Sequence, residues 1–327
     1  MKSPAVKSAY LGWLAAALAK VRGATSAIAA DGQDIVLGYA TGYDVADVAI
    51  FVRSLRSHYK GPVALVVDQD PCLRAFLAKH NVEALDAPTL CAKAVPVAKS
   101  WAPHPVVSRF AGFAALLAER SWVRNALLTD VRDVVFQSDP FGSEIGNLEF
   151  YAECDSPLAT HDFNMKYLKA LAGESFAASV SSDACICVGT VLGPREALMR
   201  FCRLILMLGA IPRSEIGGAF GADQAACNLA VHLGLIEGQV FPNHSRVATL
   251  GMVEGDVLSL ADGVIHNPDG TASPVVHQYD RHPELMKAMW ERWASDLERR
   301  DRCRPRTFGD RIDRAKQSLK RRTVELR

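Results

Sequence analysis

The segment from Asp34 to Asp68 constrains the fold more than any other part of the sequence. Two short apolar runs, 35–39 and 63–67, flank a stretch, 45–58, in which apolar residues recur at helical spacing. Apolar strands without polar alternation are typical of a parallel sheet that is covered on both faces. We therefore predict an α/β fold with a mostly parallel central sheet and helices on both faces.

The rest of the chain continues this alternation of apolar runs and helical periods. Further strands are predicted at 125–129 and 184–192. Further helices are predicted at 72–80, 107–119, 195–208, 222–232 and 284–300. Because no repeat or low-complexity linker interrupts residues 31–295, we predict one large domain there, with a helical extension at 1–30 and a basic tail at 296–327.

Composition indicates a globular protein with a sizeable core. Hydrophobic residues make up 49% of the 327 residues and charged residues 22%. The eight cysteines form no CxxC pair and no Cys/His spacing typical of zinc, which predicts reduced, mostly buried thiols in a cytoplasmic protein. The apolar run that begins at Tyr10 ends at Lys20, too short to span a bilayer.

The net charge of +1 conceals a basic C-terminal segment. Residues 299–327 contain twelve Lys or Arg and four acidic residues, so the remainder of the chain carries a net charge of −7. Such a segment is either a solvated helix end or a peripheral contact with an anionic membrane surface. Phe308 is the only aromatic residue among these charges, so we expect no binding to nucleic acid.

Polar residues follow three of the predicted strands. Ligands of parallel sheets bind beyond the carboxyl ends of the strands, which places the loop 40–44, Asp68 and Asp130 on the expected active edge. Tyr43 and Asp44 could stack on a base and bind a ribose there. The alternative is that these residues belong to solvated turns.

The segment after the strand 125–129 carries the strongest chemical signal. Asp130 and Asp133 stand three residues apart at the mouth of a buried strand, where two carboxylates can share one Mn²⁺ or Mg²⁺ ion. Such an ion can stabilise the charge that develops on a leaving diphosphate. The alternative is that these aspartates cap a turn or pair with Arg132.

Four short motifs together resemble a known family. They are Ser108-Arg109-Phe110, Asp130-Val-Arg-Asp133, Asp139-Pro-Phe141 and Asp223-Gln-Ala-Ala-Cys-Asn228. In this pattern the chain resembles the nucleotide-diphospho-sugar glycosyltransferases of the A fold, particularly glycosyltransferase family 8, over residues 34–285. It departs from them by one extra residue in the Asp-x-Asp metal motif, and it lacks the usual continuation after the C-terminal histidine.

The resemblance implies a Rossmann-like glycosyltransferase A fold and a role for each motif. It implies metal ligation by Asp130 and Asp133, completed by His277 in the C-terminal Val-Val-His segment. It implies donor binding by Tyr43, Asp44, Asp68, Arg109 and Arg132. Asp223 and Gln224 would contact the transferred sugar or the acceptor, with Asp223 as the base in an inverting enzyme and as a positioning group in a retaining one. Asp223 could also serve as a helix N-cap.

The sequence thus predicts a metal-dependent glycosyltransferase that moves a hexose from a nucleotide-diphosphate sugar to a saccharide, lipid or protein hydroxyl. The acceptor is not identified by the sequence. One alternative is a degenerate nucleotide-sugar-binding domain tethered to a membrane by the basic tail. A sugar nucleotidylyltransferase is a weaker alternative, because the loop 39–44 lacks the basic residues and phosphate-binding glycine pattern of that class.

Overall fold

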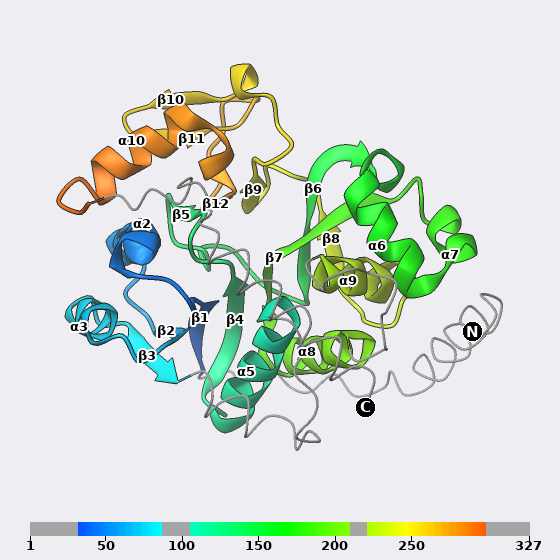
Figure 1. The fold of residues 1–327 in the computed structure, drawn as a ribbon, viewed down its shortest axis with the longest axis horizontal. Coiled ribbons are helices and arrows are strands. Elements are labelled where there is room, and N and C mark those ends of the chain that lie inside the picture. The colour runs from blue at the N-terminus through cyan, green and yellow to red at the C-terminus, as the bar shows by residue number, and fades with distance from the viewer. Residues whose placement is uncertain (1–31, 87–104, 210–220, 299–327) are drawn as a thin grey trace, which may run out of the picture.

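The computed structural model describes residues 32–86, 105–209 and 221–298. The predicted extension at 1–30 and the basic segment 299–327 lie outside these residues. A seven-stranded sheet forms the centre of the molecule, with strand order β3-β2-β1-β4-β7-β6-β8 (Figure 1). Its strands are β1 (Gln33–Tyr39), β2 (Val63–Val67), β3 (Glu83–Asp86), β4 (Val123–Thr129), β6 (Glu149–Pro157), β7 (Ala184–Pro194) and β8 (Gln239–Phe241).

The central sheet is mixed. Strands β3, β2, β1 and β4 run parallel, as the sequence predicts, but β7 is antiparallel to both of its neighbours. Thr129 at the end of β4 pairs with Thr190, so the residues that precede Thr190 extend beyond the carboxyl end of β4. The antiparallel direction of β7 therefore supplies side chains to the edge where Asp130 lies.

Two smaller sheets complete the strand arrangement. A three-stranded sheet has the order β5-β12-β9, and a two-stranded sheet pairs β10 with β11. Their strands are β5 (Val134–Phe136), β9 (Val247–Thr249), β10 (Ser259–Ala261), β11 (Val264–His266) and β12 (Val275–His277). The central strand β12 brings a C-terminal segment beside β5, which follows directly after the Asp130–Asp133 turn.

Helices pack on both faces of the central sheet, as predicted. Helices α5 and α8 belong to one core cluster, whereas α2 and α3 pack on the other face. The described helices are α2 (Val45–His58), α3 (Pro71–Lys79), α5 (Pro105–Glu119), α6 (Asp162–Ala172), α7 (Glu174–Ser179), α8 (Arg195–Gly209), α9 (Ala222–His232) and α10 (Pro283–Trp293). The prediction of a helix to residue 300 is wrong for residues 294–298, because α10 ends at Trp293 and Ala294 is its C-cap, with φ −141° and ψ 14°. Residues 299 and 300 lie outside the described residues.

The turn between β1 and α2 is defined by its own side chains. Asp44 accepts a hydrogen bond from the Asp47 amide, and Asp47 accepts one from the Asp44 amide, which makes a reciprocal capping box. Gly42 adopts φ +78°, a backbone region that favours glycine. The loop thereby passes from the end of β1 into α2 with a fixed direction.

The remaining sequence predictions concern thiols and membranes. Six cysteines lie in the described residues, all of them free, and four are buried: Cys185, Cys187, Cys202 and Cys227. The prediction of mostly buried thiols is confirmed for this part of the chain. Among the described helices, none combines the length and the apolar character that crossing a membrane would require.

Candidate functional site

Three side chains predicted from the sequence meet at the carboxyl end of β4. His277 Nε2 lies 3.4 Å from Asp130 Oδ2 and 3.8 Å from Asp133 Oδ1. The three ligand atoms all lie within 4.8 Å of one another. The residue inserted into the aspartate motif therefore does not separate the two carboxylates.

The turn after β4 explains why the two carboxylates stay together. Val131 is buried in the core beneath the turn. Its side chain occupies space that a Cβ on Gly38 would invade, so the glycine in β1 makes room for it. With Val131 anchored inward, the turn directs Asp130 and Asp133 toward the same histidine.

His277 is held rigidly by its strand. It ends β12, where it pairs with Val134 on one side and Thr249 on the other. Its ring is only 1% exposed, and its Nδ1 lies 3.6 Å from the Cys187 sulfur. The other ring nitrogen, Nε2, is buried and has no hydrogen-bond partner, although it faces two carboxylates. A buried polar atom without a partner costs free energy unless a ligand satisfies it.

The residues at this point fit a divalent cation. Two carboxylates and an imidazole are a donor set that Mn²⁺ accepts, and His277 Nε2 lies within ion-pair distance of both acids without a well-formed hydrogen bond to either. Gly189 on β7 leaves room for the side chains of His277 and Asp130, because a Cβ there would clash with the His277 ring and lie 2.8 Å from Asp130 Oδ2. The Gly189 carbonyl also accepts the Asp130 amide hydrogen at 2.7 Å.

Arg109 connects the acidic pair to α9. Its guanidinium donates to Asp130 Oδ1 and, at 2.9 Å, to Asp223 Oδ2. The arginine side chain is 12% exposed and the Asp223 side chain 7% exposed. Arg109 comes from α5, so this bridge fixes three elements around one point: the end of β4, helix α5 and the first turn of α9.

Burial and charge move the pKa values of these acids in opposite directions. Burial raises the pKa of Asp130, but the Arg109 guanidinium, followed by His277, outweighs burial and holds that pKa well below its usual range. Burial raises the pKa of Asp133, because the opposing effect of His277 is smaller. Burial likewise raises the pKa of Asp223, against the opposing charge of Arg109. The site thus keeps Asp130 ionised most firmly.

The predicted donor residues divide into two groups. Asp44 caps α2, and Asp68 accepts the Gly42 amide hydrogen at 2.5 Å, so both build the loop after β1. Arg132 lies nearer the acids, 3.5 Å from Asp280 Oδ2. Burial lowers the pKa of Arg132, but the charges of Tyr43, Asp133 and Asp280 together raise it above its usual value.

The start of α9 differs from the sequence expectation. The N-cap is Gly221, with φ +87°, and not Asp223, which lies within the first turn. Asp223 is not the N-cap residue, and its carboxylate accepts a hydrogen bond from Arg109. Gln224 turns the other way and donates to Glu153 Oε2 at 2.8 Å and to Asn164 Oδ1 at 3.0 Å.

Several polar residues beside the site were missed by sequence reasoning. They are Glu153, His161, Asn164, Cys187 and Gly189. The alternation Cys185, Cys187, Gly189 on an apolar strand was the available signal, because residues at that spacing share one face. Glu153 lies on β6 and His161 on the turn before α6, where no strand or helix was predicted.

The geometry thus joins Asp130, Asp133, His277, Arg109 and Asp223 at one edge of the sheet. A hollow of about 840 Å³ lies instead around the start of β1, lined by residues such as Gln33 and Arg124, and includes none of these five. Neither the scan of known protein families nor the search of curated proteins found a match to this chain.

Proposed function

We propose that the chain is a metal-dependent glycosyltransferase that moves a hexose from a nucleotide-diphosphate sugar to a hydroxyl acceptor. The observation that carries this proposal is the buried His277 Nε2, which has no hydrogen-bond partner and faces Asp130 and Asp133. These carboxylates belong to the motif on which the family resemblance rests. Two carboxylates and an imidazole that meet at one point could hold the cation that such a transfer uses.

Asp130, Asp133 and His277 would hold Mn²⁺ or Mg²⁺. The imidazole favours Mn²⁺ over Mg²⁺, because Mg²⁺ prefers an all-oxygen octahedral shell. Bound there, the ion would supply positive charge that stabilises the departing nucleoside diphosphate. Arg109 would orient Asp130 through its hydrogen bond, and its second hydrogen bond, to Asp223, would keep that guanidinium from rotating away.

The donor and the acceptor would approach from different sides of this centre. Tyr43 and Arg132 would contact the nucleotide, whereas Asp44 and Asp68 shape the loop after β1. Asp223 and Gln224, at the start of α9, would flank the transferred hexose. The bond from Arg109 to Asp223 supports a positioning role for this carboxylate in sugar binding.

The proposal is tested by titrating UDP and GDP into the full chain by calorimetry, first with Mn²⁺ and then with a chelator. We expect one nucleotide to bind with Mn²⁺ present and to lose at least roughly tenfold in affinity when the metal is removed. Asp130→Asn should abolish the increase in nucleotide affinity that Mn²⁺ gives. The matched control is Asp139→Asn, whose carboxylate caps the Phe141 amide outside the cluster.

An assay of turnover distinguishes the proposed glycosyltransferase from a domain that only binds nucleotide sugar. Release of nucleoside diphosphate from a nucleotide sugar, assayed over a panel of saccharide and lipid hydroxyl acceptors, is the expected result. Metal-dependent nucleotide binding without release across the panel would instead favour the degenerate, membrane-tethered domain. Binding of neither UDP nor GDP, with or without Mn²⁺, would contradict a uridine or guanosine donor and favour another donor nucleotide or the degenerate domain.

A further inference from the structure

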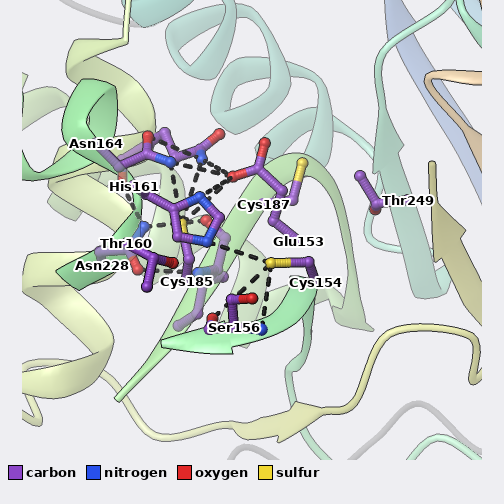
Figure 2. A network of polar contacts seen from close by, with 12 residues as sticks. Glu153, Cys154, Ser156, Thr160, His161, Asn164, Cys185, Cys187, Asn228 and Thr249 are labelled. Atoms are coloured by element: carbon purple, nitrogen blue, oxygen red, sulfur yellow. Dashed lines mark hydrogen bonds and ion pairs between the residues drawn. The ribbon is translucent and has the colours of Figure 1, made fainter. Parts of the chain in front are cut away.

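A second cluster of potential metal ligands lies on the far side of Cys187. Glu153 on β6, His161 before α6 and Cys185 on β7 place one ligand atom each within 4.8 Å of one another (Figure 2). Cys185 is fully buried and His161 is 5% exposed. None of the three belongs to the donor site described above, and their order in the sequence gives no zinc-like spacing.

Cys154 contacts one nitrogen of the His161 ring and leaves the other facing the cluster. The Cys154 sulfur lies 3.2 Å from His161 Nε2, accepts the Ser156 amide hydrogen at 3.4 Å and lies 3.8 Å from the Ser156 carbonyl. The other ring nitrogen, Nδ1, lies on the side of the ring away from Cys154 (Figure 2).

His161 Nδ1 faces the Glu153 carboxylate. It lies 4.0 Å from Glu153 Oε2, which is too far for a hydrogen bond. Within the described ranges, no lysine or arginine forms an ion pair with Glu153, and His161 is the basic side chain that faces it. A metal ion between the two groups could bind the nitrogen and the oxygen together.

The donor set selects a class of metal. A cysteine sulfur, an imidazole nitrogen and a carboxylate oxygen are ligands of Zn²⁺, and the soft thiolate in particular selects Zn²⁺ over Mg²⁺ and Mn²⁺. The Cys185 thiol donates a hydrogen bond to Glu153 Oε2 at 3.3 Å. This separation is close to that of two ligands on one tetrahedral zinc ion, about 2.3 Å from sulfur and about 2 Å from oxygen, so the ion could replace the thiol hydrogen.

Neighbouring amides hold the ligands in place. Asn164 Nδ2 donates to Glu153 Oε2 at 3.1 Å and lies 3.0 Å from Cys185 Sγ. Gln224 Nε2 donates to the same carboxylate oxygen at 2.8 Å. Metal ligands are typically oriented by such partners, and Cys154 plays the same part behind the His161 ring.

A hollow of about 490 Å³ lies beside Cys154 and is lined also by Pro157, Ala184 and Pro242, but by none of the three ligands. A zinc ion with three protein ligands takes water as its fourth.

We propose that Glu153, His161 and Cys185 bind one zinc ion, separate from the Asp130 site. On binding, the Cys185 S–H bond breaks, its proton leaves to solvent and a sulfur–zinc bond forms. The ion joins β6, the turn before α6 and β7, and through Glu153 it holds the Gln224 amide beside Asp223. This proposal does not depend on the transferase activity.

Cobalt substitution tests the site directly. Co²⁺ added to the metal-free full chain is expected to give a near-ultraviolet sulfur-to-cobalt charge-transfer band with one equivalent bound, and Zn²⁺ should bleach it. Cys185→Ser should abolish the band and His161→Gln should weaken Co²⁺ affinity at least roughly tenfold. Cys72→Ser removes an exposed thiol outside the cluster and should leave the band intact.

The two metal sites are distinguished by a cross-check. Asp130→Asn should leave the cobalt band unchanged, whatever it does to nucleotide binding. Circular dichroism and thermal unfolding of each variant without metal establish that it folds. Absence of the band in the folded wild-type chain, or its persistence in folded Cys185→Ser, would overturn the zinc proposal.

Discussion

Gly189 illustrates how one residue sets the geometry of the Asp130 site. It stands on β7 opposite the end of β4, where its carbonyl accepts the Asp130 amide hydrogen. The space above its Cα is filled by the His277 ring and the Asp130 carboxylate. Any larger residue would push the imidazole and the acid apart, in a core that has little room to relax.

We predict that Gly189→Ala weakens Mn²⁺-dependent nucleotide binding at least roughly tenfold, since overpacking of this kind costs about 1–3 kcal/mol. The measurement is the calorimetric titration described above. Gly146→Ala is the control, because a Cβ there meets nothing within 4 Å. Unchanged affinity in Gly189→Ala would mean that His277 and Asp130 do not act together in binding.

At the scale of elements, short strand β5 depends on α2 for its position. Ser54 is fully buried on α2, donates to the Phe51 carbonyl and accepts the Phe136 amide hydrogen at 3.1 Å. Phe51 and Phe136 also pack edge to face, with ring centroids 5.1 Å apart. Because β5 follows Asp133 directly, this junction fixes one side of the candidate metal site.

We predict that Ser54→Ala lowers the free energy of unfolding by about 1–3 kcal/mol, because it leaves the buried Phe136 amide without an acceptor. Urea denaturation measures the change. Ser57→Ala serves as the control on the same helix and should stay within about 0.5 kcal/mol of wild type, since Ser57 bonds only to a local carbonyl. Equal effects of both substitutions would argue against the junction.

The sequence predicted those helices and strands whose own residues encode them, and it missed those that depend on distant neighbours. The strand–helix–strand unit was predictable because long apolar runs and a capped amphipathic helix both encode it locally. Strands β5, β9 and β12 were not, because each has three residues and exists only through its neighbours. The direction of β7 was also missed, because an apolar run does not encode parallel or antiparallel pairing.

The candidate site was predictable to a similar extent. Asp130 and Asp133 carry a local signal, because they directly follow a buried strand. Sequence alone could not place His277 beside them, and only the family resemblance suggested it. The Glu153 and His161 pair left no signal, because their proximity arises from the return of β6 and the turn before α6 toward β7.

At the scale of the whole molecule, hydrogen bonds join the end of α10 and the segment after it to helix α2 near the N-terminal end of the described chain. Arg53 on α2 donates to the Trp293 carbonyl at 2.7 Å and to both carboxylate oxygens of Asp296. Helix α10 thereby closes over α2 (Figure 1). The chain that leads from His277 into α10 is thus anchored at both ends.

The hydrogen bond from Arg53, followed by smaller contributions from neighbouring groups, lowers the pKa of Asp296 to about 2. A depressed carboxyl pKa stabilises the fold above the unfolded value of about 3.9, and the stabilisation is lost as the pH falls toward 2. We predict that Asp296→Asn lowers the unfolding midpoint at pH 6, and that the gap from wild type narrows at pH 3. A gap that stays constant or widens at pH 3 would contradict the pairing.

The most direct test of the central claim is the uptake of Mn²⁺ by the full chain, followed by electron paramagnetic resonance of the free ion. The account predicts one site in the wild type that is lost in Asp133→Asn and in His277→Ala. His266→Ala, in which the altered histidine bonds only to the Gly270 carbonyl, should retain it. No uptake by the wild type, or equal uptake by all four proteins, would contradict the assignment of Asp130, Asp133 and His277 as the cation site.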